Sequence, residues 1–321
     1  MKTRITELLG IEHPILCGGL QWICRPAFVA AIANTGGTAF LTAASYGSAA
    51  ELLAAIGETR ALTSKPFGVN ISLLPDANSA DQSLAFARTV IEAGIPFVET
   101  SGRCPSHLIP LLKEAGVKIV HKVTSPAHAR TAQREGVDAI TLVGYEGGGH
   151  PGMDQVGTFV NLPATVDSVD LPVLAAGGVC DGRSMAAALA LGAEGVMMGT
   201  RWIATEECPV HQNVKEWIVG ADTTDTVIIQ RSLRNALRAI DNPKAREVLG
   251  MEQMGYGLQD LLPHISGKKG QVALAAGDLE SAVLTAGQCA GRIAFVLSAQ
   301  QVVDELLKDC EKRMGALSRL F

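Results

Sequence analysis

Short apolar runs recur along the chain roughly every 20 to 30 residues. There are eight of them, at residues 14–18, 38–43, 67–72, 97–102, 117–123, 138–144, 172–178 and 195–200. The runs are apolar throughout rather than alternating, which is typical of strands that are covered on both faces. The pattern therefore predicts eight buried strands.

Helix-like segments separate most of these runs, for example at residues 25–37, 48–62 and 181–194. Several of them close in glycine after an apolar-periodic stretch, as helices often do. Regular alternation of strand and helix implies parallel pairing of the strands. Eight such units predict the α/β class and a (β/α)8 TIM barrel, with an open doubly wound sheet as the alternative.

The strand–helix rhythm breaks after Thr200. Residues 206–284 carry helical segments at 210–222 and 243–253 and one β-like piece at 225–233. We expect an inserted, mainly helical lid domain at 206–284, with the barrel formed by residues 1–205 and 285–321. The tail, residues 281–314, has apolar positions three and four apart, which predicts helices that complete the outer wall of the barrel.

Composition narrows the class of protein. The 321 residues are 47% hydrophobic and 4% aromatic and include 34 glycines, which suits a soluble α/β enzyme. A net charge of −5 without a basic block argues against nucleic acid and anionic membranes as partners. No stretch of eighteen apolar residues is present, so no membrane span is expected. The oligomeric state stays open, with a homodimer as one option.

Cysteine usage indicates the compartment and argues against a metal. Seven scattered cysteines, behind an N-terminal segment without an apolar signal core, predict a reduced, cytoplasmic setting. No C-x-x-C pair is present, so we predict neither a metal site nor a redox disulfide. Cys17 and Cys24 flank the glycines at 18 and 19 and are predicted to be buried structural thiols, because no activating base adjoins them in the sequence.

Candidate site residues follow the ends of the predicted strands, where barrel enzymes place their active sites. In chain order they are Gly18, Gly19, Leu20, Gln21, Asn70, Lys122, His150, Gly177, Gly178, Gly199 and Thr200. Glycines after the seventh and eighth strands let backbone N–H groups approach an anion, which is the recurrent phosphate site of barrels. The alternative is a tight turn that needs positive φ.

Three polar side chains point to a heterocyclic cofactor. Lys122 can stabilise negative charge on a reduced flavin ring, although a purely structural lysine is the alternative. Asn70 and Gln21 are carboxamides that can donate and accept at the edge of such a ring.

His150 stands in the glycine-rich stretch "GYEGGGHPG" at 144–152. A neutral imidazole there can accept or donate a proton, and a histidine that merely caps a loop is the alternative. The other six histidines are assigned to surface or packing roles: His13, His107, His121, His128, His211 and His264. The predicted lid carries Arg231, Arg234 and Arg238, expected on a helix face where they are either solvated or meet an anionic group.

Several of these stretches together resemble the nitronate monooxygenase family, formerly called 2-nitropropane dioxygenases. They are "PILCGGLQW", "GVNISLLP", "HKV", "GYEGGGHPG", "LAAGGV", "MGTRWIATEECPVH" and "QRSLRNALR", between about residues 5 and 300. They look closest to the bacterial NADH:quinone reductase branch of that family.

The resemblance implies an FMN-containing TIM barrel with a lid and no metal. It implies that Gly19, Leu20 and Gln21 line the flavin ring and that Asn70 and Lys122 bond its polar edge. The phosphate is then assigned to Gly177, Gly178, Gly199 and Thr200, and Gly149 to the cofactor site beside the active-site histidine, His150.

Two departures from the family pattern stand out. In the reductase branch a glutamine stands two places after the proline of "LLP" and helps clasp the nicotinamide. Here Asp76 and Ala77 follow Pro75, which leaves NADH use open. The glycines at 147–149 replace Cys or Ala of relatives, so a roomier pocket is expected.

The resemblance leaves three functions in competition. The first is oxidation of alkyl nitronates by O2 to carbonyl compounds and nitrite, with His150 as base. The second is electron transfer from NAD(P)H, as co-substrate, to a quinone or an enoyl thioester. The third is a barrel that binds a phosphorylated ligand without redox chemistry.

Overall fold

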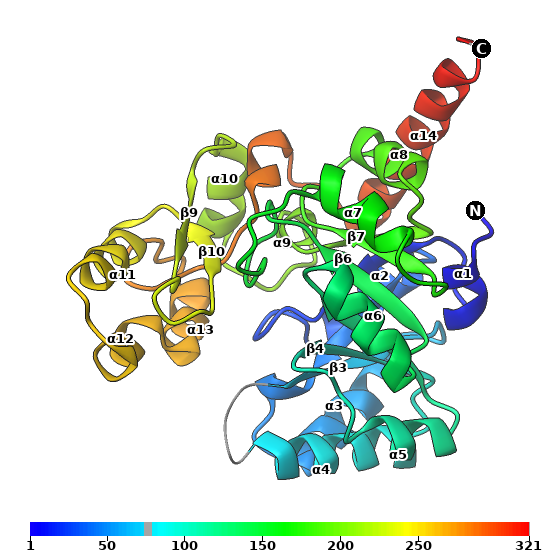
Figure 1. Ribbon diagram of the computed structural model, residues 1–321, viewed down its shortest axis with the longest axis horizontal. Helices are drawn as coiled ribbons and strands as arrows, with labels where there is room; N and C mark the ends of the chain where they lie inside the picture. Colours follow the sequence, from blue (N-terminus) through cyan, green and yellow to red (C-terminus); the bar gives the residue numbers. More distant parts are fainter. Residues whose placement is uncertain (74–78, 321) are drawn as a thin grey trace.

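The centre of the computed structural model, which describes residues 1–73 and 79–320, is a closed barrel of eight parallel strands (Figure 1). Neighbouring strands pair in sequence order, and β8 pairs with β1. The strands are β1 Ile15–Cys17, β2 Thr38–Thr42, β3 Gly68–Leu73, β4 Phe97–Gly102, β5 Lys118–Val123, β6 Ala139–Val143, β7 Val173–Ala176 and β8 Gly195–Met198. Each predicted run matches one strand, and only β3 extends past its run, by one residue. The predicted TIM barrel is confirmed, and the open doubly wound sheet is wrong.

Helices between the strands form the outer layer of the barrel. After α1 (Arg4–Leu9), they are α2 Pro26–Asn34, α3 Ala49–Leu62, α4 Ser79–Glu92, α5 Ile109–Glu114, α6 Pro126–Glu135, α7 Thr158–Val166 and α8 Gly182–Ala190. A 3₁₀ turn, η1, covers Ala43–Ser45. Side-chain caps fix several starts, because Ser48, Ser125 and Asp181 each accept a hydrogen bond from a first-turn backbone N–H.

Period-two alternation along the strands separates two cores. Phe40, Phe97 and Val120 belong to a cluster inside the barrel, whereas Leu41 and Val98 face the helices. The rings of Phe40 and Phe97 meet edge to face, with centroids 5.7 Å apart. The apolar filling closes the barrel interior below the strand ends.

The short helix α9 (Thr200–Ile203) follows β8, and residues 206–284 then form a group of elements beside the barrel, green-yellow to orange in Figure 1. They are α10 Gln212–Gly220, β9 Thr226–Ile229, β10 Leu237–Ile240, α11 Pro243–Gln253, α12 Leu258–Ile265 and α13 Gly267–Ala276. β9 and β10 pair antiparallel. The sequence indicated α10, β9 and α11 but missed β10. The expected helix face of Arg231, Arg234 and Arg238 is therefore wrong.

The tail returns to the barrel. α14 (Ala299–Leu317) packs against α8, and the approach is close enough that a Cβ at Gly182 would lie 2.5 Å from the backbone nitrogen of Cys310. Residues 281–298 hold only a 3₁₀ turn, η2 (Gln288–Arg292), so the prediction of helices is correct for α14 alone. Across the described residues, every helix is too short or too polar to cross a bilayer.

Candidate functional site

A polar layer lies inside the barrel directly above the apolar filling. Strand register places Thr42, Asn70 and Glu99 side by side on β2, β3 and β4. Lys122 lies on β5, two residues beyond the partner of Glu99, and is opposite Thr141 of β6. The inward positions thus change from apolar to polar toward the carboxyl ends of the strands, where barrel active sites lie.

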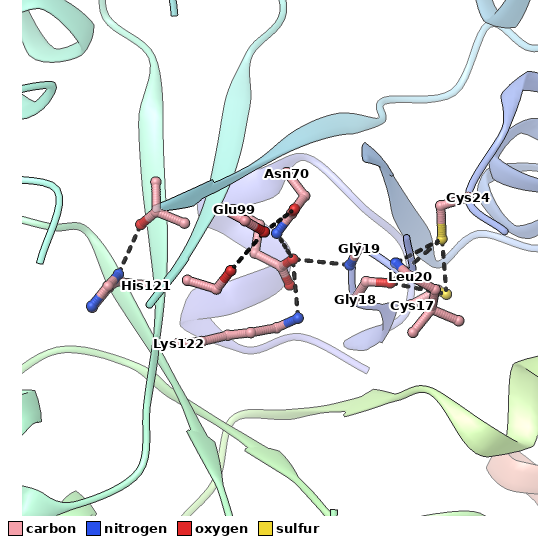
Figure 2. Close-up of polar contacts among 12 residues, drawn as sticks. Cys17, Gly18, Gly19, Leu20, Cys24, Asn70, Glu99, His121 and Lys122 are labelled. Atoms are coloured by element: carbon pink, nitrogen blue, oxygen red, sulfur yellow. Dashed lines mark hydrogen bonds and ion pairs between the residues drawn. The ribbon is translucent and has the colours of Figure 1, made fainter. Parts of the chain in front are cut away.

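Glu99 is the centre of this polar layer (Figure 2). Its side chain is fully buried, and Oε2 accepts from Asn70 Nδ2 at 2.5 Å and from the Gly19 backbone N–H at 2.9 Å. The same oxygen lies 3.1 Å from Lys122 Nζ. Three residues that the sequence proposed separately for the cofactor site, Gly19, Asn70 and Lys122, therefore converge on one carboxylate.

The other polar atoms of the layer are incompletely bonded. Within the described residues, Glu99 Oε1, Thr42 Oγ1 and Thr141 Oγ1 are buried without a hydrogen-bond partner. Buried polar groups are normally satisfied. Unpaired oxygens of this kind fit a site whose polar ligand completes the bonding.

The loop after β1 passes close over Asn70. A Cβ at Gly19 would lie 2.4 Å from Asn70 Cβ, so only glycine fits there. Leu20 is half-buried, and its Cδ2 lies 3.4 Å from the position of a Cβ at Gly199. Gln21 is exposed and faces Gly267 at the start of α13. Gly19 thus borders the polar layer and Leu20 the turn after β8, whereas Gln21 lies against the 206–284 region.

The thiols beside this loop are structural. Cys17 and Cys24 are completely buried, with their sulfurs 3.9 Å apart. Burial and the neighbouring Cys24 raise the pKa of Cys17 well above its ordinary value. A thiolate nucleophile is therefore disfavoured at this position, as the sequence predicted.

Two glycine turns end β7 and β8. Gly177 and Gly178 have φ of 85° and 80°, the left-handed region that other residues avoid. At Gly199 a Cβ would meet only Leu20, so the space beside the backbone is open. Thr200 Oγ1 accepts from the Gly287 N–H at 2.9 Å, which ties this turn to the chain that returns from residues 206–284.

His150 follows the glycine loop after β6 and is exposed. Among the described residues, no side chain or backbone group forms a hydrogen bond with its ring. The protein around the ring nevertheless lowers the pKa of His150 from its ordinary value, because partial dehydration disfavours the imidazolium. The lowered pKa favours the neutral imidazole, and the exposed side chain is accessible to a small molecule.

Arg238 of β10 holds the glycine loop in place. Its buried guanidinium donates to the backbone oxygen of Tyr145 from Nε at 3.1 Å and from Nη2 at 2.9 Å, and lies over the Tyr145 ring. Arg231 and Arg234 are exposed in the preceding turn. Arg238 thus binds the protein's own backbone, and the alternatives of a solvated or anion-binding helix face are both wrong for it.

The three glycines at 147–149 do not share one environment. A Cβ at Gly148 would lie 2.6 Å from the backbone carbon of Ala286, and one at Gly147 would lie 3.0 Å from Val143 Cγ1. Only Gly149, with φ of 76°, has open space beside it. The expectation of a roomier pocket is therefore wrong for Gly147 and Gly148, because Val143 lies beside the first and the returning chain at Ala286 beside the second. Pro75, Asp76 and Ala77 lie outside the described residues.

Comparison with known proteins decides the family. The family model described as nitronate monooxygenase matches residues 2–309. The chain belongs to the nitronate monooxygenase family. It is an oxidoreductase of that family, whose members are flavoenzymes that act on small molecules.

Three relatives illustrate the range of the family. The (3aS,4S,5R,7aS)-5-hydroxy-7a-methyl-1-oxo-octahydro-1H-indene-4-carboxyl-CoA dehydrogenase of Mycobacterium tuberculosis is 34% identical, with 100% of this chain and 99% of the relative covered. A probable nitronate monooxygenase of Staphylococcus aureus is 30% identical, with 98% of each chain covered. The solved structure of FabK from Thermotoga maritima is 38% identical, with a TM-score of 0.91 and full coverage of both chains.

Sequence reasoning missed Glu99, the residue that connects the others. Its run, "FVETSG", counts as apolar overall, and Glu99 is the one charged residue within it. A carboxylate in the middle of a buried strand needs a partner. That signal was sufficient to place Glu99 among the candidates beside Lys122.

Proposed function

We propose that the flavin of this protein is FMN and that it lies across the carboxyl ends of the strands. Its phosphate is assigned to the turns of Gly177, Gly178, Gly199 and Thr200, and its ring to Gly19 and Leu20 with Lys122 and Asn70 at the polar edge. The open space at Gly199 and the unpaired buried oxygens of the polar layer support this assignment. Bound flavin supplies the electron transfer, while the protein supplies orientation and electrostatics.

The assigned reaction is the oxidation of alkyl nitronates. The observation that carries it is the accessible, neutral imidazole of His150, which has no protein partner in the described part of the chain. A neutral imidazole removes the proton from the carbon of a nitroalkane, or donates its N–H to the nitronate oxygens. The match to the nitronate monooxygenase family model over residues 2–309 supports this substrate class.

A second candidate reaction is electron exchange with an acyl thioester, with NAD(P)H as the other substrate where the thioester is reduced. The 34% identical relative from M. tuberculosis, matched over the whole chain, is named as a dehydrogenase of a carboxyl-CoA compound. The same histidine then exchanges a proton with the carbon next to the thioester carbonyl. A quinone is the other candidate that could accept the electrons of NAD(P)H in this reaction.

Residues 206–284 are assigned as a lid over the site. Arg238 joins this region to the loop that holds His150, and Gly287, three residues after the region, bonds to Thr200. The seven cysteines are all unpaired, which supports a reducing, cytoplasmic setting.

Anaerobic reduction of the FMN-loaded protein separates the reactions. We expect propionate-3-nitronate to bleach the flavin and nitrite to appear once O2 is admitted, while NADH and NADPH leave the flavin oxidised. Bleaching by a nicotinamide, with reoxidation by an enoyl-CoA, would establish the second candidate instead. Failure of the folded protein to bind FMN would exclude both.

A further inference from the structure

Glu99 is buried so deeply that its charge requires compensation within the barrel. Its side chain is fully buried, and moving a carboxylate out of water is unfavourable unless hydrogen bonds and an opposite charge replace the solvent. Lys122 is the cation that pairs with it in the described part of the chain. The two charges form an ion pair of net zero charge beneath the proposed flavin edge.

The two oxygens of the Glu99 carboxylate have different surroundings. Asn70, Gly19 and Lys122 all contact Oε2. The other oxygen, Oε1, lies 3.2 Å from the position that a Cβ at Gly18 would take. Lys122 is 22% exposed, whereas its partner Glu99 is fully buried. An ammonium carries three donors, so one contact with Glu99 leaves two for a ligand.

The same carboxylate fixes the orientation of Asn70. Because Asn70 donates from Nδ2 to Glu99, its Oδ1 is left to accept from Ser72 Oγ at 3.0 Å, and Ser72 in turn contacts Ser101 Oγ at 3.1 Å. This chain of contacts crosses β3 and β4. Glu99 thus determines how Asn70 and Lys122, the two side chains assigned to the flavin edge, are presented.

We propose that Glu99 is a positioning residue that holds Lys122 and Asn70 at the flavin edge and offsets the Lys122 charge, so that the bound flavin is harder to reduce than beside an unpaired lysine. The inference rests on the proposed function, because it requires FMN at the strand ends. Reduced flavin carries more negative charge than oxidised flavin, and a nearby unpaired cation therefore favours the reduced form.

Redox titration of the FMN-loaded protein tests this directly. Glu99→Gln keeps the shape and the hydrogen-bond acceptor but removes the negative charge. We expect reduced FMN to bind about tenfold more tightly relative to oxidised FMN than in the native protein, which for a two-electron couple raises the midpoint potential by about 30 mV. Lys122→Met is expected to shift the potential in the opposite direction, and the double variant to return it toward the native value.

Glu194→Gln is the matched control. Glu194 pairs with Arg4 before β8, at the opposite end of the barrel, so the same loss of charge is expected to leave the potential unchanged. Thermal unfolding and FMN affinity of each variant separate a charge effect from a loss of structure. If Glu99→Gln does not fold, the test uses the other two variants. Lys122→Met is then expected to lower the midpoint potential, and the double variant to return it toward the native value.

Two outcomes are distinguishable. If native protein binds FMN and the potentials of Glu99→Gln and Lys122→Met equal the native value or shift in the same direction, this inference is overturned while the proposed function stands. If folded native protein binds no FMN, the proposed function fails and the inference fails with it.

Discussion

Gly149 and Arg238 form an antiparallel bridge between the loop of His150 and strand β10. The Arg238 N–H donates to the Gly149 oxygen at 2.7 Å, and the Gly149 N–H donates to the Arg238 oxygen at 3.1 Å. The Arg238 side chain adds bonds to Tyr145 O and to Thr226 Oγ1. Gly149 precedes His150, the proposed proton-transfer group. It is therefore held by Arg238, which lies 238 − 149 = 89 positions further along the chain.

Replacing Arg238 by lysine tests the side-chain bonds that hold the loop of His150 beside this bridge. Lysine keeps the charge but cannot form the forked bonds to Tyr145 O, so the loop is expected to loosen. We expect kcat to fall about tenfold to a hundredfold, because small misplacements of a reacting group have effects of that size, with FMN retained. Arg234→Lys, at an exposed position of the same region, is the control. Native kcat in Arg238→Lys would show that the guanidinium bonds to Tyr145 O do not position His150.

His150→Ala is expected to retain FMN and to lose at least about a hundredfold in turnover of a neutral nitroalkane, the usual scale of general base catalysis. Because the folded protein lowers the pKa of His150, the base form persists below the ordinary value of about 6.5. The acid limb of the kcat/KM profile therefore lies below pH 6.5 in the native protein and is absent in the variant. His13→Ala, before β1 at the other end of the barrel, is the control. An unchanged acid limb in His150→Ala would assign the proton transfer to another group.

Gly199→Ala separates folding from cofactor binding. Its φ of −122° lies outside the left-handed region, and the new Cβ would meet only Leu20 Cδ2 at 3.4 Å. We expect a native melting temperature but an FMN affinity at least about tenfold weaker, because the methyl group enters the proposed phosphate space. Gly57→Ala, in α3 with nothing within 4 Å, is the control. Native FMN affinity in Gly199→Ala would move the phosphate away from this turn.

His121 makes the fold sensitive to acid. Burial lowers the pKa of His121 to about 4, and the ring contacts Thr100 Oγ1 at 2.8 Å. Because the unfolded chain takes up a proton near pH 6.5 and the folded chain does not, stability is full above that pH and falls toward pH 4, by up to about 1.4 kcal/mol per pH unit. Urea unfolding at pH 7 and pH 5 gives the loss of unfolding free energy between these two pH values. We expect this loss to be about 2 kcal/mol larger in the native protein than in His121→Gln. Parallel losses in the two proteins would exclude His121 as the cause.

The barrel could be predicted because each of its strands and helices is indicated by a short, continuous stretch of sequence. Each strand is an apolar run such as 117–123, bounded by turn residues, and eight such units leave few ways to close a sheet. The ends of these strands then mark Asn70, Lys122 and His150 as candidates without knowledge of distances.

The contacts between distant segments could not be predicted in the same way. β10, at Leu237–Ile240, is only four residues long and includes Arg238, so its pattern is too short to distinguish a strand from a helix. That Arg238 binds Tyr145, or that Ala286 fills the space beside Gly148, depends on how the 206–284 region returns to the barrel. Such non-local packing leaves no period in the sequence.

The central claim is that FMN lies over the polar layer built around Glu99. A crystal structure of the protein with FMN tests it most directly. We expect the phosphate within hydrogen-bond distance of the Gly178 and Gly199 backbone, the ring edge beside Lys122, and His150 on the open side of the ring. A flavin bound elsewhere on the barrel, or with its phosphate away from these glycine turns, would contradict the account.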